Sequence, residues 1–262
     1  MNTNSPYRYF IHLAYDGTRF FGWQVQENQI TVQGVLEEQL SRLMGKPVRI
    51  TGCGRTDTGV HARSFFAHFD LDRKVDDVNE LCRRLNHMLP PEILLFRIFP
   101  VSNEVHARFS ALSRTYHYYL FREKDPFNRN WGWLYRGELN HEAMNRAAAI
   151  LKDVSDFTSF AKLHTETKTN ICKVSEAKWI TEGNRWVFII SADRFLRNMV
   201  RAVVGTLVDI GRGKISEQDF IRIIEARDRS AAGPSAPARG LFLEKVCYPA
   251  ESVPGPYGSM LI

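Results

Sequence analysis

The sequence has few of the features that mark a secreted, membrane-spanning or metal-stabilised protein. Cysteine is scarce, and no two cysteines have the spacing of a metal site or a redox motif; they stand at Cys53, Cys82, Cys172 and Cys247. This scarcity favours a reduced intracellular protein over a disulfide scaffold. The first residues hold neither a basic segment nor an apolar core of the kind found in a secretory signal. We therefore expect a cytoplasmic protein.

Long hydrophobic runs and phosphate-binding glycine loops are also missing. The longest apolar stretch, Met199–Ile210, is interrupted by Arg201 and Asp209, so we expect no membrane span. No Walker-type or G-x-G-x-x-G segment occurs, which disfavours a doubly wound nucleotide-binding fold. The 262 residues that are present are 44% hydrophobic and carry a formal net charge of +6. They are enough for a real core, and their positive charge favours an anionic partner, with nucleic acid as the first candidate.

Hydrophobic periodicity predicts alternating strands and helices along the chain. In the first half the expected order is β-α-β-β-α-β. Strands are expected over residues 7–15, at the apolar run 48–50, from the following loop to about residue 71, and over 93–101; helices are expected over 32–44 and 78–89. In the second half strands are expected near residues 114–122, 171–180, 185–192 and 241–248, and helices after Asn140, over 196–210 and over 217–227. This mixture predicts an α/β (α+β) fold in which helices cover one face of a mostly antiparallel sheet.

The order of elements also predicts two similar lobes. We place an N-terminal lobe over residues 1–105 and a C-terminal lobe over residues 106–250, followed by a tail over residues 251–262. Both lobes are large enough to hold a hydrophobic core of their own.

The stretch G-C-G-R-T-D-T-G-V-H-A, residues 52–62, is the first candidate for a reactive site. It lies between two apolar runs and is expected to form a tight loop between strands. Gly52, Gly54 and Gly59 are expected to adopt backbone conformations that a Cβ would forbid. Asp57, next to Arg55, has the chemistry of a nucleophile, a base or a metal ligand, although the composition equally fits an ordinary turn.

A metal site at Asp57 would need partners, and the nearby histidines are His61 in the loop and His68 on the strand that follows. Strand alternation puts His61 and His68 on opposite faces of a sheet, which disfavours a joint site. We therefore expect no metal, and we expect His61 to support the loop by packing.

Two further constellations combine aromatic or charged residues with apolar surroundings. In R-T-Y-H-Y-Y, Tyr116 and Tyr118 share one face of a strand, where their rings either stack on nucleobases or fill a core. In F-L-R-N-M-V-R, Arg197 and Arg201 are one turn apart on an apolar helix. Such an arginine either needs an anionic partner or extends to solvent at the edge of the helix.

Six segments together resemble the tRNA pseudouridine synthase A family, in the same order along the chain. They are Y-D-G-T-R-F-F-G-W-Q (15–24), G-R-T-D-T-G-V-H-A (54–62), H-A-R-F-S-A-L-S-R-T-Y-H-Y (106–118), D-F-T-S-F (156–160), F-L-R-N-M-V-R (195–201) and G-L-F-L (240–243). The resemblance implies isomerisation of uridine to pseudouridine at nucleotides 38, 39 and 40 of the tRNA anticodon stem-loop. It also implies a homodimer of two-lobed subunits, an active-site cleft between the lobes, and no cofactor or metal.

The same resemblance implies roles for individual residues. Asp57 matches the catalytic aspartate, Arg201 its arginine partner, and Tyr116 the tyrosine that packs against the target base. Leu241 matches an apolar residue of the pocket, and Arg55 an arginine that helps to extrude the base. The attack of the aspartate on C1′, its attack on C6, and removal of the ribose 2′ proton all remain open.

Two other functions compete with this interpretation. A non-catalytic tRNA-binding protein or chaperone on the same fold would bind tRNA and leave its uridines unmodified. An acid–base hydrolase using Asp57 and His61 would instead consume water.

Overall fold

The computed structural model describes residues 7–162 and 169–253. By its internal contacts the chain divides into two compact units. Unit 1 holds the described residues up to Leu112 together with those from Leu243 onward, and unit 2 holds Ser113–Phe242. Unit 1 is therefore completed by a segment that returns from the far end of the chain. The lobe limits expected from the sequence, 1–105 and 106–250, stay a prediction.

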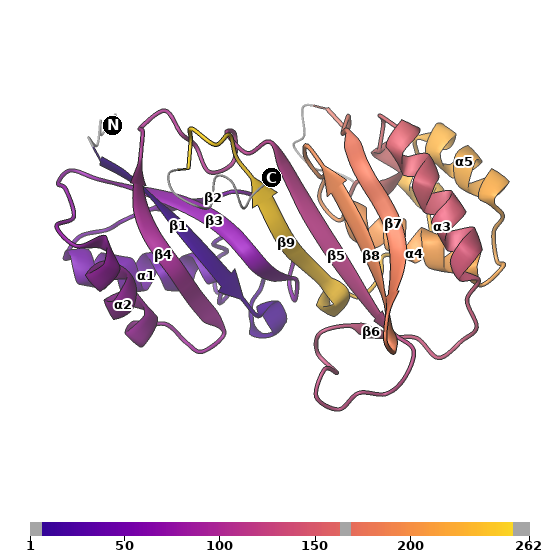
Figure 1. Ribbon diagram of the computed structural model, residues 1–262, viewed down its shortest axis with the longest axis horizontal. Helices are drawn as coiled ribbons and strands as arrows, with labels where there is room; N and C mark the ends of the chain where they lie inside the picture. Colours follow the sequence, from indigo (N-terminus) through magenta and orange to yellow (C-terminus); the bar gives the residue numbers. More distant parts are fainter. Residues whose placement is uncertain (1–6, 163–168, 254–262) are drawn as a thin grey trace. The chain divides into compact units, whose positions relative to one another are not determined.

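The sheet of unit 1 is built around its first strand. β1 (Tyr7–Tyr15) lies between β4 (Ile93–Val101) and β3 (His61–Leu71), and both run antiparallel to it. On the other side of β3 lies β9 (Leu241–Cys247), and the short β2 (Ile50–Gly52) also pairs with β3 in antiparallel register. These strands are the indigo-to-magenta and yellow arrows of Figure 1.

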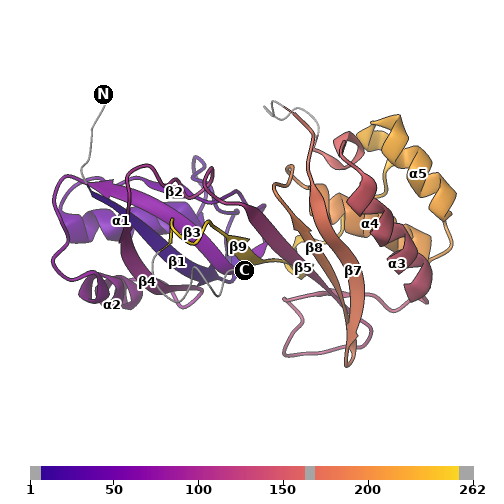
Figure 2. The same cartoon turned by 45° about the horizontal axis from the view of Figure 1, so that its top comes forward.

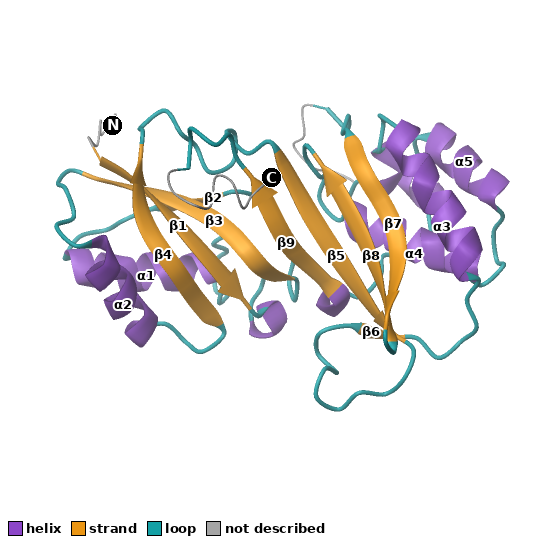
Figure 3. Ribbon diagram, viewed as in Figure 1, coloured by secondary structure: helices purple, strands orange, loops and turns teal. Residues whose placement is uncertain are grey.

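Two helices cover one face of this sheet, as Figure 3 shows. α1 (Val32–Met44) begins where Thr31 Oγ1 accepts a hydrogen bond from Gly34 N, and it ends at Gly45, whose φ of 68° is left-handed. α2 (Val78–Met88) packs on β4. Tyr9 lies on this side of the sheet, because its hydroxyl accepts a hydrogen bond from Val75 N just before α2.

The opposite face of the sheet in unit 1 is covered by the segments around residues 107 and 248. Tyr248 packs edge-on against Phe10 and Phe66, with ring centroids 5.6 and 5.2 Å apart. His68, also on this face, accepts a hydrogen bond at Nδ1 from Ala107 N at 3.2 Å. The segment around residue 107 is thereby tied to the sheet.

In unit 2 the strands pair mostly in antiparallel register. β8 (Arg185–Ala192) lies between β5 (Ser113–Phe121) and β7 (Val174–Glu182), and the two-residue β6 (Trp133–Leu134) runs parallel to β5. The helices α3 (His141–Ile150), α4 (Met199–Gly211) and α5 (Glu217–Ala226) pack on one another, and α3 packs on β7. Figures 1 and 2 both show the three helices gathered beside β7.

Most of the expected elements are confirmed. The strands over residues 7–15, 93–101 and 185–192 have the predicted bounds, and Thr31 and Asn140 cap helices as expected. The mixed α/β class with a mostly antiparallel sheet is also confirmed.

Two boundaries were wrong. The strand expected from residue 171 begins at Val174, because Ile171 instead forms an isolated bridge with Asp156. The helix expected from residue 196 begins at Met199, because Asn198 adopts a left-handed conformation with φ 66° just before it. Arg197 therefore lies outside α4, and the expected one-turn pair with Arg201 does not form on a helix.

Across residues 7–162 and 169–253, no helix is both long enough and apolar enough to span a bilayer.

A pH dependence of stability follows from His68. Burial lowers its pKa from 6.5 to about 4, and Arg8 and His106 add to the shift while Asp70 opposes it. The folded state thus favours the neutral ring. Its stabilising contribution is present above about pH 6.5 and is lost as the pH falls toward about 4.

We expect His68→Asn, which keeps an acceptor for Ala107 N but cannot titrate, to flatten this dependence. Urea unfolding at about pH 7 and about pH 5 measures it: the wild-type free energy of unfolding should fall more steeply than that of the variant. An equal fall in the free energy of unfolding of the two proteins would contradict the assignment of the pH dependence to His68.

Candidate active site

The loop that carries Asp57 is the turn of the β2–β3 hairpin, and its backbone is fixed from several directions. Cys53 N donates to Phe66 O at 2.7 Å, and Val60 N donates to Asp57 O at 3.1 Å. Two bonds join the loop to the segment after β1: Trp23 N donates to Thr56 O at 3.2 Å, and Gly59 N donates to Phe20 O at 3.3 Å. The carboxylate therefore stands on a backbone with little freedom to move.

The segment after β1 lies against the loop at van der Waals distance. Gly22, with φ 82°, faces the backbone of Thr56 and Asp57, and a Cβ there would collide with Thr56 O. A Cβ at Gly17 would likewise collide with Val60 O. The Y-D-G-T-R-F-F-G-W-Q segment is thus a support for the Asp57 loop, which is a role that sequence analysis did not assign to it.

The glycines inside the loop differ in their importance. Gly59 has φ 76°, which favours glycine, and a Cβ on Gly52 would lie 2.6 Å from the Trp23 ring. Gly54 was expected to behave in the same way, and that expectation is wrong. A Cβ there would meet nothing within 4 Å, and its φ is not positive.

Asp57 and Arg55 differ in exposure. Asp57 is half-buried, whereas Arg55 is exposed, and within the part of the chain that the structure describes the Arg55 side chain has no hydrogen-bond or ion-pair partner. An exposed guanidinium two residues from the carboxylate suits contact with an incoming polyanion.

His61 is buried beneath the loop, with 1% of its surface exposed. Its Nδ1 lies 3.1 Å from Gly17 N and 3.0 Å from Asp16 Oδ1, so the ring supports the turn after β1. Among residues 7–162 and 169–253, no group of three His, Cys, Asp or Glu side chains is placed to hold a metal ion.

In unit 2 the two tyrosines of β5 have different environments. Tyr118 is fully buried, and its hydroxyl donates to Pro237 O at 2.9 Å. Tyr116 is half-buried and meets the edge of Phe195, with ring centroids 5.0 Å apart. Tyr118 therefore belongs to the core, and Tyr116 is the one of the pair that a ligand can reach.

Arg201 is the single residue of α4, as described from Met199 to Gly211, that is not buried. Its Nε donates to Ala236 O at 2.8 Å, and its own backbone carbonyl accepts from Ala236 N at 2.9 Å. The stem of the side chain is thereby oriented by the 236 segment. Arg197 is exposed and precedes the helix, so the two arginines do not act as a pair.

Leu241, the first residue of β9, is 6% exposed. It follows Gly240, where a Cβ would lie 2.6 Å from Tyr118 Cζ. Burial raises the pKa of Tyr118 above its usual range, and the charges of Arg201 and Arg239 act in the opposite direction.

Tyr118 therefore connects the expected site residues of unit 2. It lies two residues from Tyr116 on β5, next to Gly240, and within electrostatic reach of Arg201. The sequence pattern does not indicate this role of Tyr118, although the i, i+2 spacing on the strand places it on the same face as Tyr116.

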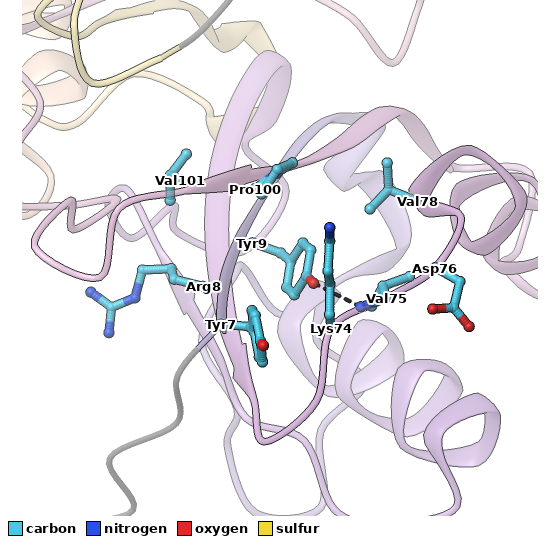
Figure 4. Close-up of a pocket in the computed structure, with 9 residues that line it drawn as sticks. All are labelled: Tyr7, Arg8, Tyr9, Lys74, Val75, Asp76, Val78, Pro100 and Val101. Atoms are coloured by element: carbon cyan, nitrogen blue, oxygen red, sulfur yellow. Dashed lines mark hydrogen bonds between the residues drawn. The ribbon is translucent and has the colours of Figure 1, made fainter.

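A hollow of about 250 Å³ in unit 1 lies apart from these residues. Figure 4 shows it between the start of β1, the end of β4 and the segment before α2, with the side chains of Tyr7, Lys74 and Val101 around it. The Asp57 loop is at the opposite end of the sheet, since Tyr7 pairs with Leu71 and Tyr15 with Ala62. The hollow is therefore not part of the candidate site.

Comparisons with known proteins agree with the motifs. A family model described as tRNA pseudouridine synthase matches residues 11–110 and 147–249. Arg55, Asp57, Arg201 and Leu241 lie inside the matched segments, and Tyr116 lies between them.

Individual relatives match almost the whole chain. A protein of Parabacteroides distasonis named tRNA pseudouridine synthase A is 53% identical over 247 residues, which are 94% of this chain and 98% of the relative. Proteins of the same name from Porphyromonas gingivalis and Clostridium acetobutylicum are 52% and 36% identical, over 93% and 91% of this chain and 98% of each relative. These matches confirm the resemblance inferred from the six motifs, and the chain belongs to the tRNA pseudouridine synthase family.

Proposed function

We propose that this protein isomerises uridine to pseudouridine at nucleotides 38, 39 and 40 in the anticodon stem-loop of tRNA. Family membership and the names of the relatives, which specify tRNA, support the reaction and its substrate. The observation that carries the proposal is the presentation of Asp57: a half-buried carboxylate in a loop held by hydrogen bonds to the segment after β1. A carboxylate positioned in this way suits covalent or acid–base catalysis.

The proposed site combines residues of both units. We propose that two lobes flank a cleft in which Asp57 pairs with Arg201, while Tyr116 and Leu241 contact the uracil. The exposed charge of Arg55 and the half-buried charge of Arg201 support binding of an anionic substrate in such a cleft. Homodimerisation, as the family resemblance implies, is part of the proposal, and no cofactor is required.

The reaction rearranges bonds without net oxidation or hydrolysis. The N1–C1′ glycosidic bond breaks, the uracil turns, and a C5–C1′ bond forms. The proton on C5 is lost and a proton is gained at N1, so atoms and charge balance. Asp57 provides either the nucleophile, at C1′ or C6, or the base for the ribose 2′ proton.

The remaining residues bind and position the base. A nucleotide of a helical stem must be flipped out, which costs a few kcal/mol in lost stacking. Arg55, exposed beside the aspartate, is suited to occupy the vacated space. The accessible ring of Tyr116, braced by the edge of Phe195, offers a flat surface to the uracil, and its hydroxyl is a candidate relay for the C5 proton.

Asp57→Asn tests the central role. The change preserves the shape of the side chain but removes the nucleophile and base, so we expect tritium release from 5-tritiated uridine in tRNA to be abolished while tRNA binding survives. Asp76→Asn removes an exposed carboxylate at the other end of the sheet and should retain wild-type activity. Full activity in Asp57→Asn would disprove the catalytic role. Wild-type protein that binds tRNA and releases no tritium would instead favour the non-catalytic tRNA-binding alternative.

Tyr116→Phe separates the two roles of the tyrosine. If the hydroxyl relays the C5 proton, this variant should bind tRNA normally and release tritium about 100-fold more slowly in a single turnover. Tyr118→Phe, the same change two residues along β5, removes the bond to Pro237 and should instead lower the free energy of unfolding by about 1–3 kcal/mol. A wild-type rate in Tyr116→Phe would limit Tyr116 to contact through its ring.

A further inference from the structure

A tight turn on unit 1, residues 106–112, is fixed to the sheet far more firmly than an ordinary surface loop. Two hydrogen bonds join residues 106 and 110: Ser110 N donates to His106 O, and His106 N donates to Ser110 Oγ, both at 2.9 Å. Inside the turn, His106 Nδ1 accepts from Arg108 N at 3.1 Å and from Phe109 N at 3.3 Å.

The sheet and the last strand anchor the same turn from below. Ala107 is fully buried; its N–H donates to His68 Nδ1, and its carbonyl accepts from the hydroxyl of Tyr248. Leu112 N donates to Cys247 O at 2.8 Å. Just before the turn, Arg8 donates to the carbonyls of Asn103 and Val105. The geometry of the turn is therefore determined before any ligand arrives.

This rigid turn presents an aromatic ring to solvent. Phe109 is 75% exposed, and the Arg108 guanidinium carbon lies 5.5 Å from the centre of its ring. The centres of the His106 and Phe109 rings are 4.4 Å apart, and the ring planes are tilted by 34°. Exposing a phenyl ring forgoes most of the free energy that its burial would contribute to folding, and an exposed aromatic ring is available to bind a ligand.

The turn is also distant from the Asp57 loop. His68, which anchors it, is seven residues along β3 from His61 at the end of that loop. At about 3.3 Å per residue this is about 23 Å along the strand. A nucleotide that reacts at Asp57 cannot reach Phe109.

We propose that Arg108 and Phe109 form a contact for an unpaired base of the substrate tRNA, separate from the uridine that reacts. The ring would stack on the base and the guanidinium would bind the adjoining phosphate; the inference rests on the proposed tRNA-modifying function. Single-stranded bases are recognised in this way, by aromatic rings and arginines on a preformed surface. The net charge of +6 and the cation that borders the ring favour a polyanion as the ligand.

The test separates binding from chemistry. We expect Phe109→Ala to weaken tRNA binding about tenfold or more at fixed salt, with an unchanged single-turnover rate of tritium release at saturating tRNA. Phe109→Trp, which keeps a stacking ring, should restore the affinity. Arg108→Ala should weaken binding. It should also lower the slope of log Kd against log salt concentration by about the contribution of one phosphate contact. Met88→Ala is the matched control and should bind as the wild type does. It shortens an exposed apolar side chain on α2, which covers the other face of the sheet.

Three outcomes would overturn the inference. The contact is absent if Phe109→Ala binds tRNA as tightly as the wild type, or if Phe109→Trp is as weak as the alanine variant. Loss of the oligomeric state in Phe109→Ala, measured by sedimentation, would assign the ring to a protein interface. Failure of the proposed function looks different, because wild-type protein would then release no tritium even if Phe109→Ala had lost affinity for tRNA.

Discussion

The close approach of two backbone segments in unit 1 is the constraint on which the candidate site depends. Gly22 and Gly17 allow the segment after β1 to lie directly on the Asp57 loop, where a Cβ would collide with Thr56 O or Val60 O. Contact at this distance makes two inter-segment hydrogen bonds possible, at Thr56 and at Gly59. The aspartate is therefore positioned mainly by backbone groups, which cannot change rotamer and lose little entropy when substrate binds.

In unit 2 the candidate residues are positioned by the packing of a buried side chain. A buried tyrosine, Tyr118, fills the space between β5 and the 237–240 segment, and the absence of a side chain on Gly240 makes room for its ring. The adjoining segment also supplies the carbonyl of Ala236 that holds Arg201. Packing of one aromatic ring thus fixes the path of the backbone that orients the arginine, and the two elements cannot be altered independently.

Local patterns were enough to predict much of this arrangement. β1, β4 and β8 were found at their observed bounds because each alternates or is continuously apolar between turn residues, and the Thr31 cap was found because its hydroxyl bonds locally. Periodicity failed at the starts of β7 and α4. Ile171 looks like the start of a strand, yet it pairs with Asp156, fifteen positions away in the chain numbering. The apolar period of α4 extends back to Leu196, but the left-handed Asn198 stops the helix.

The candidate residues were found from motifs, whereas their supports were not. Nothing in a linear pattern indicates that Gly22 faces the backbone of Asp57, or that Tyr118 lies against Gly240, because both contacts join segments more than thirty residues apart. Gly54 shows the opposite error, since glycine in a reactive loop suggests a strained backbone where the structure has none. Composition identifies which groups carry chemistry, and tertiary packing decides which neighbours hold them.

Reliance on backbone supports has a consequence for the proposed catalysis. Developing charge is stabilised best by side chains that are already in place, because any reorganisation during the reaction adds to the barrier. In both units the candidate side chains extend from segments whose hydrogen bonds are made by neighbouring backbone atoms, as at Thr56, Val60 and Ala236. The carboxylate, the guanidinium and the phenol can therefore act on substrate without giving up the interactions that keep their segments folded. The same logic accounts for the turn at Phe109, where histidine acceptors and backbone donors hold a ring outward so that binding incurs little further ordering cost.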